Sequence, residues 1–216
     1  MTTSDRYRAV GLTGNPFIAQ QKQGKSVAPI KKLFVARGAP DLPPPGSRTL
    51  LQVIGDAGFG KSTHLEWWRS LQPGPLHYVP REPYKARWNQ PPLVKAGFKE
   101  AMVYGDEVDR MPKLLRSRWF RHLSQRRATL VIGTHVDLAD LGKRSGFDVI
   151  THLLEPLDLP TLIDIVENRL AAFSTGKNND TLFTVSELEE VLRESGGNPR
   201  EAEVLCHKLL AMKVGS

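Results

Sequence analysis

The chain has 216 residues, of which 40% are hydrophobic and 25% charged, and this ordinary globular composition excludes an extensively disordered protein. No apolar run is long enough to span a membrane, and a single cysteine cannot form an internal disulfide. The net charge of +7 favours an acidic partner such as nucleic acid. The first eight residues lack the apolar centre of a secretory signal, so we expect a cytoplasmic protein.

Residues 1–48 show no clear periodicity. They contain the segment Asn15-Pro16-Phe17, a lysine-rich stretch from Lys22 to Lys32 and a proline cluster from Pro40 to Pro45. This composition predicts an ordered leader followed by a stiff linker.

A phosphate-binding loop follows the first predicted strand, Thr49–Ile54. Its pattern is G-x-x-x-x-G-K-S, and the residues that we expect to contact nucleotide are Gly55, Asp56, Ala57, Gly58, Phe59, Gly60, Lys61, Ser62 and Thr63. Glycines let such a loop wrap around an anion with its N–H groups pointing inward, and the next helix adds its positive dipole end. The lysine, Lys61, would reach the β- and γ-phosphates, and the Ser62 hydroxyl would hold Mg²⁺. The strand before the loop and the unbroken helical stretch after it, up to Leu71, supply the context that this motif requires.

Two carboxylates end another apolar strand. After a short strand at Leu76–Val79, prolines between Pro80 and Pro92 predict an extended connection, and the run Ala101–Gly105 then leads to Asp106 and Glu107. Ligands bind at the carboxyl ends of parallel strands. We therefore expect Asp106 to lie beside the Mg²⁺ and Glu107 to polarise the attacking water.

A basic stretch follows these carboxylates. Between Arg110 and Arg127 it carries seven cations and no acidic residue, with Trp119 and Phe120 among them. The pattern fits a DNA-binding surface. It equally fits a solvated amphipathic helix in which Leu114, Leu115, Trp119 and Leu123 face the core.

A further strand, Thr129–Gly133, brings Thr134 and His135 to the same edge of the sheet. Either side chain could sense the γ-phosphate, and we favour Thr134 because a lone histidine there is more often a supporting or surface residue. With a last strand at Val149–Leu154, the alternation predicts an α/β fold: a P-loop NTPase parallel sheet flanked by helices.

The residues after Pro156 have helical periodicity. Asp158 is the predicted cap of one helix, Ser186 with Glu189 the predicted capping box of a second, and Gly196-Gly197 its end. A last helix begins near Pro199 and includes Cys206, which we expect to be a small core residue. The predicted domains are a leader and linker at 1–48, an ATPase core at 49–156 and a small all-helical lid at 157–216.

In the order of these motifs the chain resembles the AAA+ ATPases and related signal-transducing P-loop ATPases. Residues Gly55–Thr63 match Walker A, Met102–Glu107 match Walker B, Thr134 matches sensor 1, and Gly197-Asn198-Pro199-Arg200 matches sensor 2. The resemblance implies that ATP and Mg²⁺ are the cofactors and that Arg200 contacts the γ-phosphate from the lid. It also implies that the Asn15-Pro16-Phe17 segment packs near the adenine.

Members of these families often form homo-oligomeric rings in which a neighbour's arginine completes the site. The resemblance makes Arg144 the candidate for that arginine, with Arg126 and Arg127 as alternatives. The short Pro-rich connection before Walker B argues against a polypeptide-threading unfoldase. The absence of an appended DNA-reading module after the lid argues against an origin initiator.

The expected function is that of a slow ATPase, whose cycle between ATP and ADP acts as a switch for DNA or for a protein partner. The first alternative is a non-hydrolysing, ATP-dependent protein-interaction module. The second is a small-molecule P-loop kinase, which Asp106 and Glu107 disfavour because they suit water activation better.

Overall fold

The computed structural model describes residues 3–17, 33–79, 102–176 and 182–215, and the Pro-rich connection from Pro80 to Pro92 lies outside them. The chain divides into two compact units. The sheet unit comprises Gly38–Leu154, and the helical unit combines Met1–Arg37 with Glu155–Ser216. No helix in the described ranges is long and apolar enough to cross a membrane.

The sheet unit contains five parallel strands in the order β2-β3-β4-β1-β5. Their bounds are Thr49–Ile54 for β1, Leu76–Tyr78 for β2, Met102–Asp106 for β3, Thr129–Thr134 for β4 and Asp148–Leu153 for β5. The central strands are runs of β-branched and apolar residues, as a sheet covered on both faces requires. The predicted α/β fold with a parallel P-loop sheet is confirmed.

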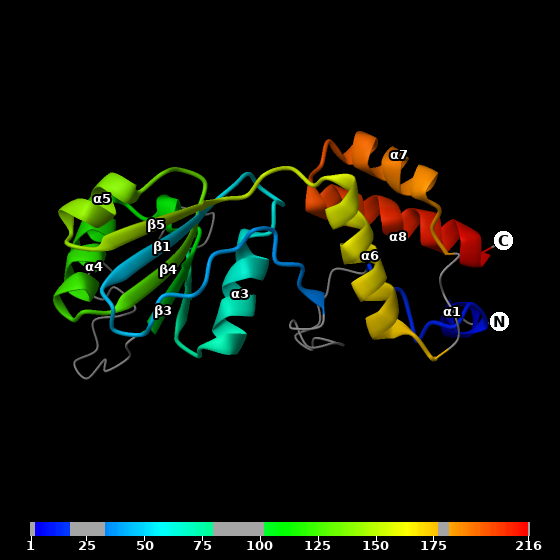
Figure 1. Cartoon of the computed structure of the whole chain (residues 1–216), viewed down its shortest axis with the longest axis horizontal. Helices are drawn as coiled ribbons and strands as arrows, with labels where there is room; N and C mark the ends of the chain where they lie inside the picture. Colours follow the sequence, from blue (N-terminus) through cyan, green and yellow to red (C-terminus); the bar gives the residue numbers. More distant parts are fainter. Residues whose placement is uncertain (1–2, 18–32, 80–101, 177–181, 216) are drawn as a thin grey trace. The chain divides into compact units, whose positions relative to one another are not determined.

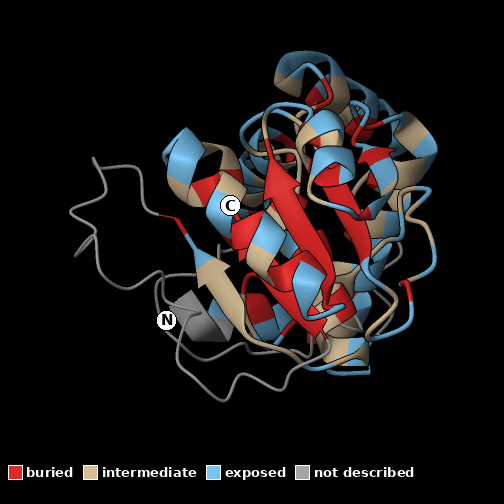
Figure 2. Cartoon of the chain, turned by 90° about the vertical axis from the view of Figure 1, so that its left-hand side faces the viewer, coloured by how far each residue is buried: buried red, intermediate tan, exposed pale blue. Residues whose placement is uncertain are grey.

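Helices cover both faces of this sheet (Figure 1). On one face α3 (Lys61–Leu71) packs through Leu65 and Trp68. On the other face α4 (Lys113–Gln125) and α5 (Ala139–Arg144) enclose a core that includes Trp119 and Phe120. A short 3-10 helix, η2 (Val108–Arg110), joins β3 to α4. Figure 2 shows the central strands of the sheet as a buried layer between the helices, in agreement with the burial of β1, β3 and β4.

The helical unit is built from α1 (Thr3–Ala9), α6 (Leu159–Phe173), α7 (Val185–Ser195) and α8 (Pro199–Gly215). Residues that precede the sheet in sequence belong to this core: Tyr7, Leu12 and Phe17 are buried with residues of all three C-terminal helices. The Thr13 amide donates to the carbonyl of Phe173 at 2.8 Å. Cys206 is buried in the same core, as predicted, and burial raises the pKa of its thiol to about 12.

The caps of the C-terminal helices confirm two predictions and correct one. Asp158 accepts a hydrogen bond from the Thr161 amide at 2.9 Å, and Gly196 ends α7 in a left-handed conformation with φ 58°. The predicted capping box of Ser186 with Glu189 is wrong.

The actual capping box pairs Thr184 with Glu187. Both pairs have the capping-box spacing of three residues, but only the Thr184 cap puts Phe183 before the helix and Leu188 at its fourth position. These two apolar residues both belong to the helical core, as in a hydrophobic staple.

Candidate nucleotide site at the carboxyl edge of the sheet

The phosphate loop connects the central strand β1 to α3. Gly58 and Gly60 have φ of 91° and 96°, values that suit glycine. Gly60 is the N-cap of α3 and supplies no side-chain cap, and the first turn carries no acidic residue. The first N–H groups of α3 lack intrahelical partners, so this helix end can accept an anion.

Lys61 lies in the first turn of α3 and is only 4% exposed. Its ammonium donates to the carbonyls of Gly55 at 2.8 Å and Asp56 at 3.1 Å. Burial lowers the pKa of Lys61, and nearby carboxylates, Glu107 foremost, oppose that shift. A phosphate group at the loop would act in the same direction as the carboxylates and favour the charged form.

Ser62 and Asp106 meet directly across the end of the sheet. The Ser62 hydroxyl donates to Oδ2 of Asp106 at 2.6 Å, and the Glu107 amide donates to Oδ1 at 3.0 Å. Gly133 in the neighbouring strand makes room for this carboxylate, because a Cβ there would lie 2.7 Å from Asp106 Oδ1. The two predicted metal ligands are therefore adjacent, with oxygen donors of the kind that Mg²⁺ prefers.

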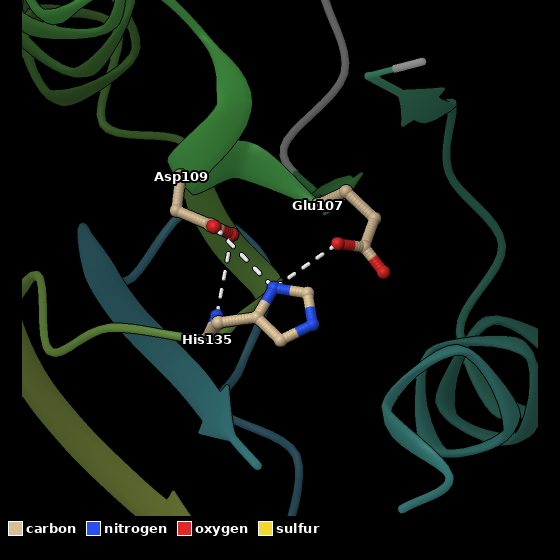
Figure 3. Close-up of side chains that lie close together, drawn as sticks. All are labelled: Glu107, Asp109 and His135. Atoms are coloured by element: carbon tan, nitrogen blue, oxygen red, sulfur yellow. Dashed lines mark hydrogen bonds and ion pairs between the residues drawn. The ribbon is translucent and has the colours of Figure 1, made fainter. Parts of the chain in front are cut away.

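Glu107 stands at the start of η2 with a left-handed backbone, φ 58°, which is uncommon for a residue other than glycine. Its Oε2 lies 2.9 Å from the guanidinium of Arg110 and 3.2 Å from Nδ1 of His135. Figure 3 shows the imidazole between Glu107 and Asp109. Within the described chain no hydrogen bond or ion pair engages the other oxygen, Oε1. One oxygen thus lies at ion-pair distance from Arg110 and His135, and the other is available to a ligand.

Asp109 holds His135 from the opposite side. Its Oδ1 accepts the His135 amide at 3.2 Å, and its Oδ2 lies 3.3 Å from Nδ1 of the same residue. Arg116 donates to the Asp109 carbonyl at 2.9 Å. Asp109 therefore fixes both the backbone and the ring of His135.

Thr134, the favoured sensor, is fully buried and directs its hydroxyl to its own loop. Oγ1 donates to the Val136 carbonyl at 2.9 Å and accepts from the Val136 amide at 3.2 Å. The loop that follows is held to β1 by buried Gln52, which donates to Asp137 at 2.6 Å and accepts from the Leu138 amide at 2.8 Å. The adjacent side chain, His135, is the one that contacts Glu107.

The three arginines considered for a neighbour's site lie away from the phosphate loop. Arg144 is in the last turn of α5, before β5, and Arg126 and Arg127 separate α4 from β4. These positions are at the amino ends of the strands, whereas the loop is at their carboxyl ends. Within one chain they do not join the site described above.

Arg200 belongs to the helical unit and lies exposed in the first turn of α8. Its backbone N–H donates to the side-chain oxygen of Asn198 at 3.0 Å. Asn198 thus caps the helix that carries the predicted lid arginine. The Asn15-Pro16-Phe17 segment is in the same unit, where Arg169 donates to the Pro16 carbonyl at 2.9 Å.

In the fold, part of the basic stretch from Arg110 to Arg127 contacts other residues of the chain and part is exposed to solvent. Arg110 and Arg116 are engaged at the carboxyl edge, and Trp119 and Phe120 are buried in the core. The remaining cations are exposed: Lys113, Arg118, Arg121, Arg126 and Arg127. Leu114, expected in the alternative interpretation to face the core, is 62% exposed.

Sequence reasoning assigned no role to Gly133 or Asp109. A glycine within the apolar strand Thr129–Thr134 signals a close backbone approach and could have identified Gly133. Asp109 follows the two predicted carboxylates by only two residues, but its contact with His135 depends on the pairing of β3 with β4.

Solved structures are similar to this chain in fold. A point mutant of RuvB from Thermotoga maritima is 18% identical with a TM-score of 0.52, covering 78% of this chain and 57% of that one. The RuvB Holliday junction branch migration motor of that organism is 21% identical with a TM-score of 0.49, covering 73% and 52%. The Aeropyrum pernix ORC1 protein in complex with DNA is 20% identical with a TM-score of 0.42, covering 83% and 63%.

The chain therefore spans about half the length of the RuvB structures, which it matches over 52% and 57% of their residues. No protein-family model matches the sequence, and no curated protein is similar to it in sequence. The likeness to the RuvB mutant and the strand order β2-β3-β4-β1-β5 agree with the resemblance drawn from the motifs. The chain has an α/β P-loop NTPase fold, and in fold it is similar to the AAA+ ATPase RuvB.

Proposed function

We propose that this protein is an ATPase that binds Mg²⁺ and ATP at the phosphate loop and hydrolyses ATP slowly. The observation that carries the proposal is the meeting of Ser62 with Asp106 beside buried Lys61, at the uncapped start of α3. The likeness of the fold to the RuvB mutant supports it.

The residues present suit Mg²⁺ with a nucleoside triphosphate. Ser62 and Asp106 would hold the ion, which supplies neutralising charge to the phosphates when bound. Lys61 and the N–H groups at the start of α3 would bind the phosphate oxygens. Gly133 keeps the space beside Asp106 open, since any larger residue would displace that carboxylate.

Glu107 is the proposed general base. Its Oε2 lies within ion-pair distance of Arg110 and His135, which would orient Oε1 to accept a proton from the attacking water. Both arginines described at this edge are engaged, Arg110 with Glu107 and Arg116 with the Asp109 carbonyl. Within one chain, Lys61 would therefore be the side-chain cation that adds to the charge of Mg²⁺ in stabilising the transition state. We expect slow turnover unless an arginine from a neighbouring copy also reaches the site.

Two variants test the proposal. Lys61→Ala should abolish binding of a fluorescent ATP analogue, whereas Glu107→Gln should bind it normally and lose at least about 100-fold in phosphate release, as expected for a lost general base. Normal turnover by Glu107→Gln would contradict the assignment of the base. ATP binding without turnover by the wild-type protein, with and without DNA, would instead favour a non-hydrolysing interaction module.

Three roles carried over from the family resemblance remain predictions. Thr134 or His135 would sense the γ-phosphate, Arg200 would contact it, and Arg144 would act in the site of a neighbouring copy. Contributions from Arg126 or Arg127 are the alternative to Arg144. A change of solution mass with a non-hydrolysable ATP analogue, lost in Arg144→Ala, would support assembly through that residue.

DNA is the proposed partner. The protein carries a net charge of +7, and the outer side of α4 presents cations to solvent. The charge of this surface and its exposure to solvent support DNA as the partner.

A further inference from the structure

Exposed cations line the edge of the sheet opposite the phosphate loop. Strands β4, β1 and β5 are parallel neighbours, so the segments that precede them meet at one edge. We call the exposed cations of these segments the amino edge: Arg48, Arg126, Arg127, Lys143 and Arg144.

Two of these arginines have a backbone conformation that is unfavourable for residues other than glycine. Arg48 and Arg127 both have a φ of 56°, in the left-handed region that suits glycine or asparagine. In the described chain Glu107 is the third such residue without being glycine, and it belongs to the proposed catalytic site. Non-glycine residues in this conformation concentrate at functional sites, where the side chain justifies the strain.

Helix ends within the same chain show what Arg127 replaces. Helices α4, α5 and α7 all end with a bond from an amide back to a carbonyl five residues earlier: Ala128 to Leu123 at 3.0 Å, Phe147 to Gly142 at 3.0 Å and Gly197 to Leu192 at 3.2 Å. The left-handed residue inside each turn is Arg127, Gly146 and Gly196, respectively. Glycine is the usual residue at this position. An arginine at one of three equivalent turns indicates that its side chain is needed there.

The charges of Arg48 and Arg127 are not paired with an acidic side chain in the described part of the chain. The outward face of α4 carries Lys113, Arg118 and Arg121 toward the same edge, along a helix of 13 residues, or about 20 Å. Asp148 is also exposed at this edge, but one negative charge does not balance the five cations of the amino edge.

We propose that the amino edge and the outward face of α4 together bind the phosphodiester backbone of nucleic acid. This deepens the DNA contact proposed above and does not depend on ATP turnover. Phosphates, and not bases, are the expected ligands, because Trp119 and Phe120 are buried and cannot stack on bases. Binding is therefore expected to be insensitive to sequence and sensitive to salt.

The test measures binding of a fluorescent DNA duplex without nucleotide, over a series of salt concentrations. Arg48→Asn and Arg127→Asn each remove one charge while placing a residue that accepts the left-handed conformation. Each should weaken binding to all duplex sequences alike and reduce the slope of log K against log salt by about 0.9, the value for one lost phosphate contact. Arg48→Lys and Arg127→Lys should retain the wild-type slope.

Stability provides an independent readout, because removal of the strain should raise the thermal midpoint of Arg127→Gly while its DNA binding falls. Lys208→Gln removes an exposed cation from α8 in the helical unit and should leave binding and slope unchanged. Equal losses in Lys208→Gln would overturn the proposal, since net charge alone would then explain binding. Unchanged DNA binding in both Asn variants would also overturn it, as would a loss of self-association alone, which would assign the edge to a second copy.

If the proposed ATPase fails, this test is unaffected, because no nucleotide is present. If the amino edge fails, ATP binding by Arg48→Asn should still match that of the wild-type protein. The two proposals can therefore be refuted separately.

Discussion

At the scale of single residues, the chemistry available at the carboxyl ends of the strands depends on which carboxylate oxygens already contact other residues of the chain. Asp106 uses one oxygen for the Ser62 hydroxyl and the other for a backbone amide. Glu107 uses one oxygen for Arg110 and His135. Both oxygens of Asp109 contact His135, one at its backbone amide and the other at its ring. The third acid therefore acts through the histidine, and we infer that it positions Glu107 without contacting the nucleotide.

This inference gives a prediction for Asp109→Asn and His135→Ala. Both should lower kcat for ATP hydrolysis by about tenfold while the KM for ATP stays near its wild-type value, because they disturb the orientation of the base but not phosphate binding. His135→Gln, which keeps a side-chain N–H, should recover part of the rate. Steady-state kinetics decide: a rise in KM with unchanged kcat would show that His135 contributes to nucleotide binding instead.

At the scale of elements, the strands and helices could largely be predicted from sequence, because short apolar runs and helical periodicity give local signals. The bounds of β1, Thr49–Ile54, agree with the prediction, and the residues that match the Walker motifs lie at strand ends as expected. The cap of α7 could not be settled locally, since two overlapping sites matched the same spacing. The choice depended on Phe183 and Leu188, whose shared burial is a tertiary property.

The corrected cap gives a matched pair of variants. Thr184→Ala removes the hydroxyl that accepts the Glu187 amide and should lower the free energy of unfolding of the helical unit by about 1 kcal/mol. Ser186→Ala, in the first turn, should change it by less than about 0.5 kcal/mol. Thermal or denaturant unfolding monitored by circular dichroism measures both. An equal loss in the two variants would mean that Ser186 shares the capping role.

The arrangement at the carboxyl edge was only partly predictable for the same reason. The motifs predicted Lys61 and Ser62 in one short pattern and Asp106 and Glu107 in another, because each pattern is local in the sequence. The contact of His135 with Glu107 and the space left by Gly133 arise from the pairing of β3 with β4, which no spacing records.

At the scale of the whole molecule, the helical unit is built from both ends of the chain, and the sheet unit lies between them in sequence. The segment that contains Tyr7, Leu12 and Phe17 belongs to the same core as the C-terminal helices, although the whole sheet unit separates them in sequence. Such long-range contacts leave no periodic signal in the leader.

The leader is therefore expected to be necessary for the stability of the helical unit. Leu12→Ala, at a fully buried position, should lower the free energy of unfolding of that unit by about 2–5 kcal/mol, because it leaves a cavity. Leu71→Ala, at a position 49% exposed, is the control and should have a much smaller effect. Scanning calorimetry measures both variants. An unchanged thermal transition in Leu12→Ala would show that the leader contributes little to the core.

The burial of Cys206 also makes the protein suitable for site-directed labelling. A thiol that is 1% exposed, with its pKa raised to about 12, stays protonated and inaccessible to maleimide reagents at neutral pH. A cysteine introduced at an exposed position would be the sole reactive thiol without removal of the native one. Pairs of spin labels or fluorophores, one on each unit, could then report how the distance between the units responds to ATP.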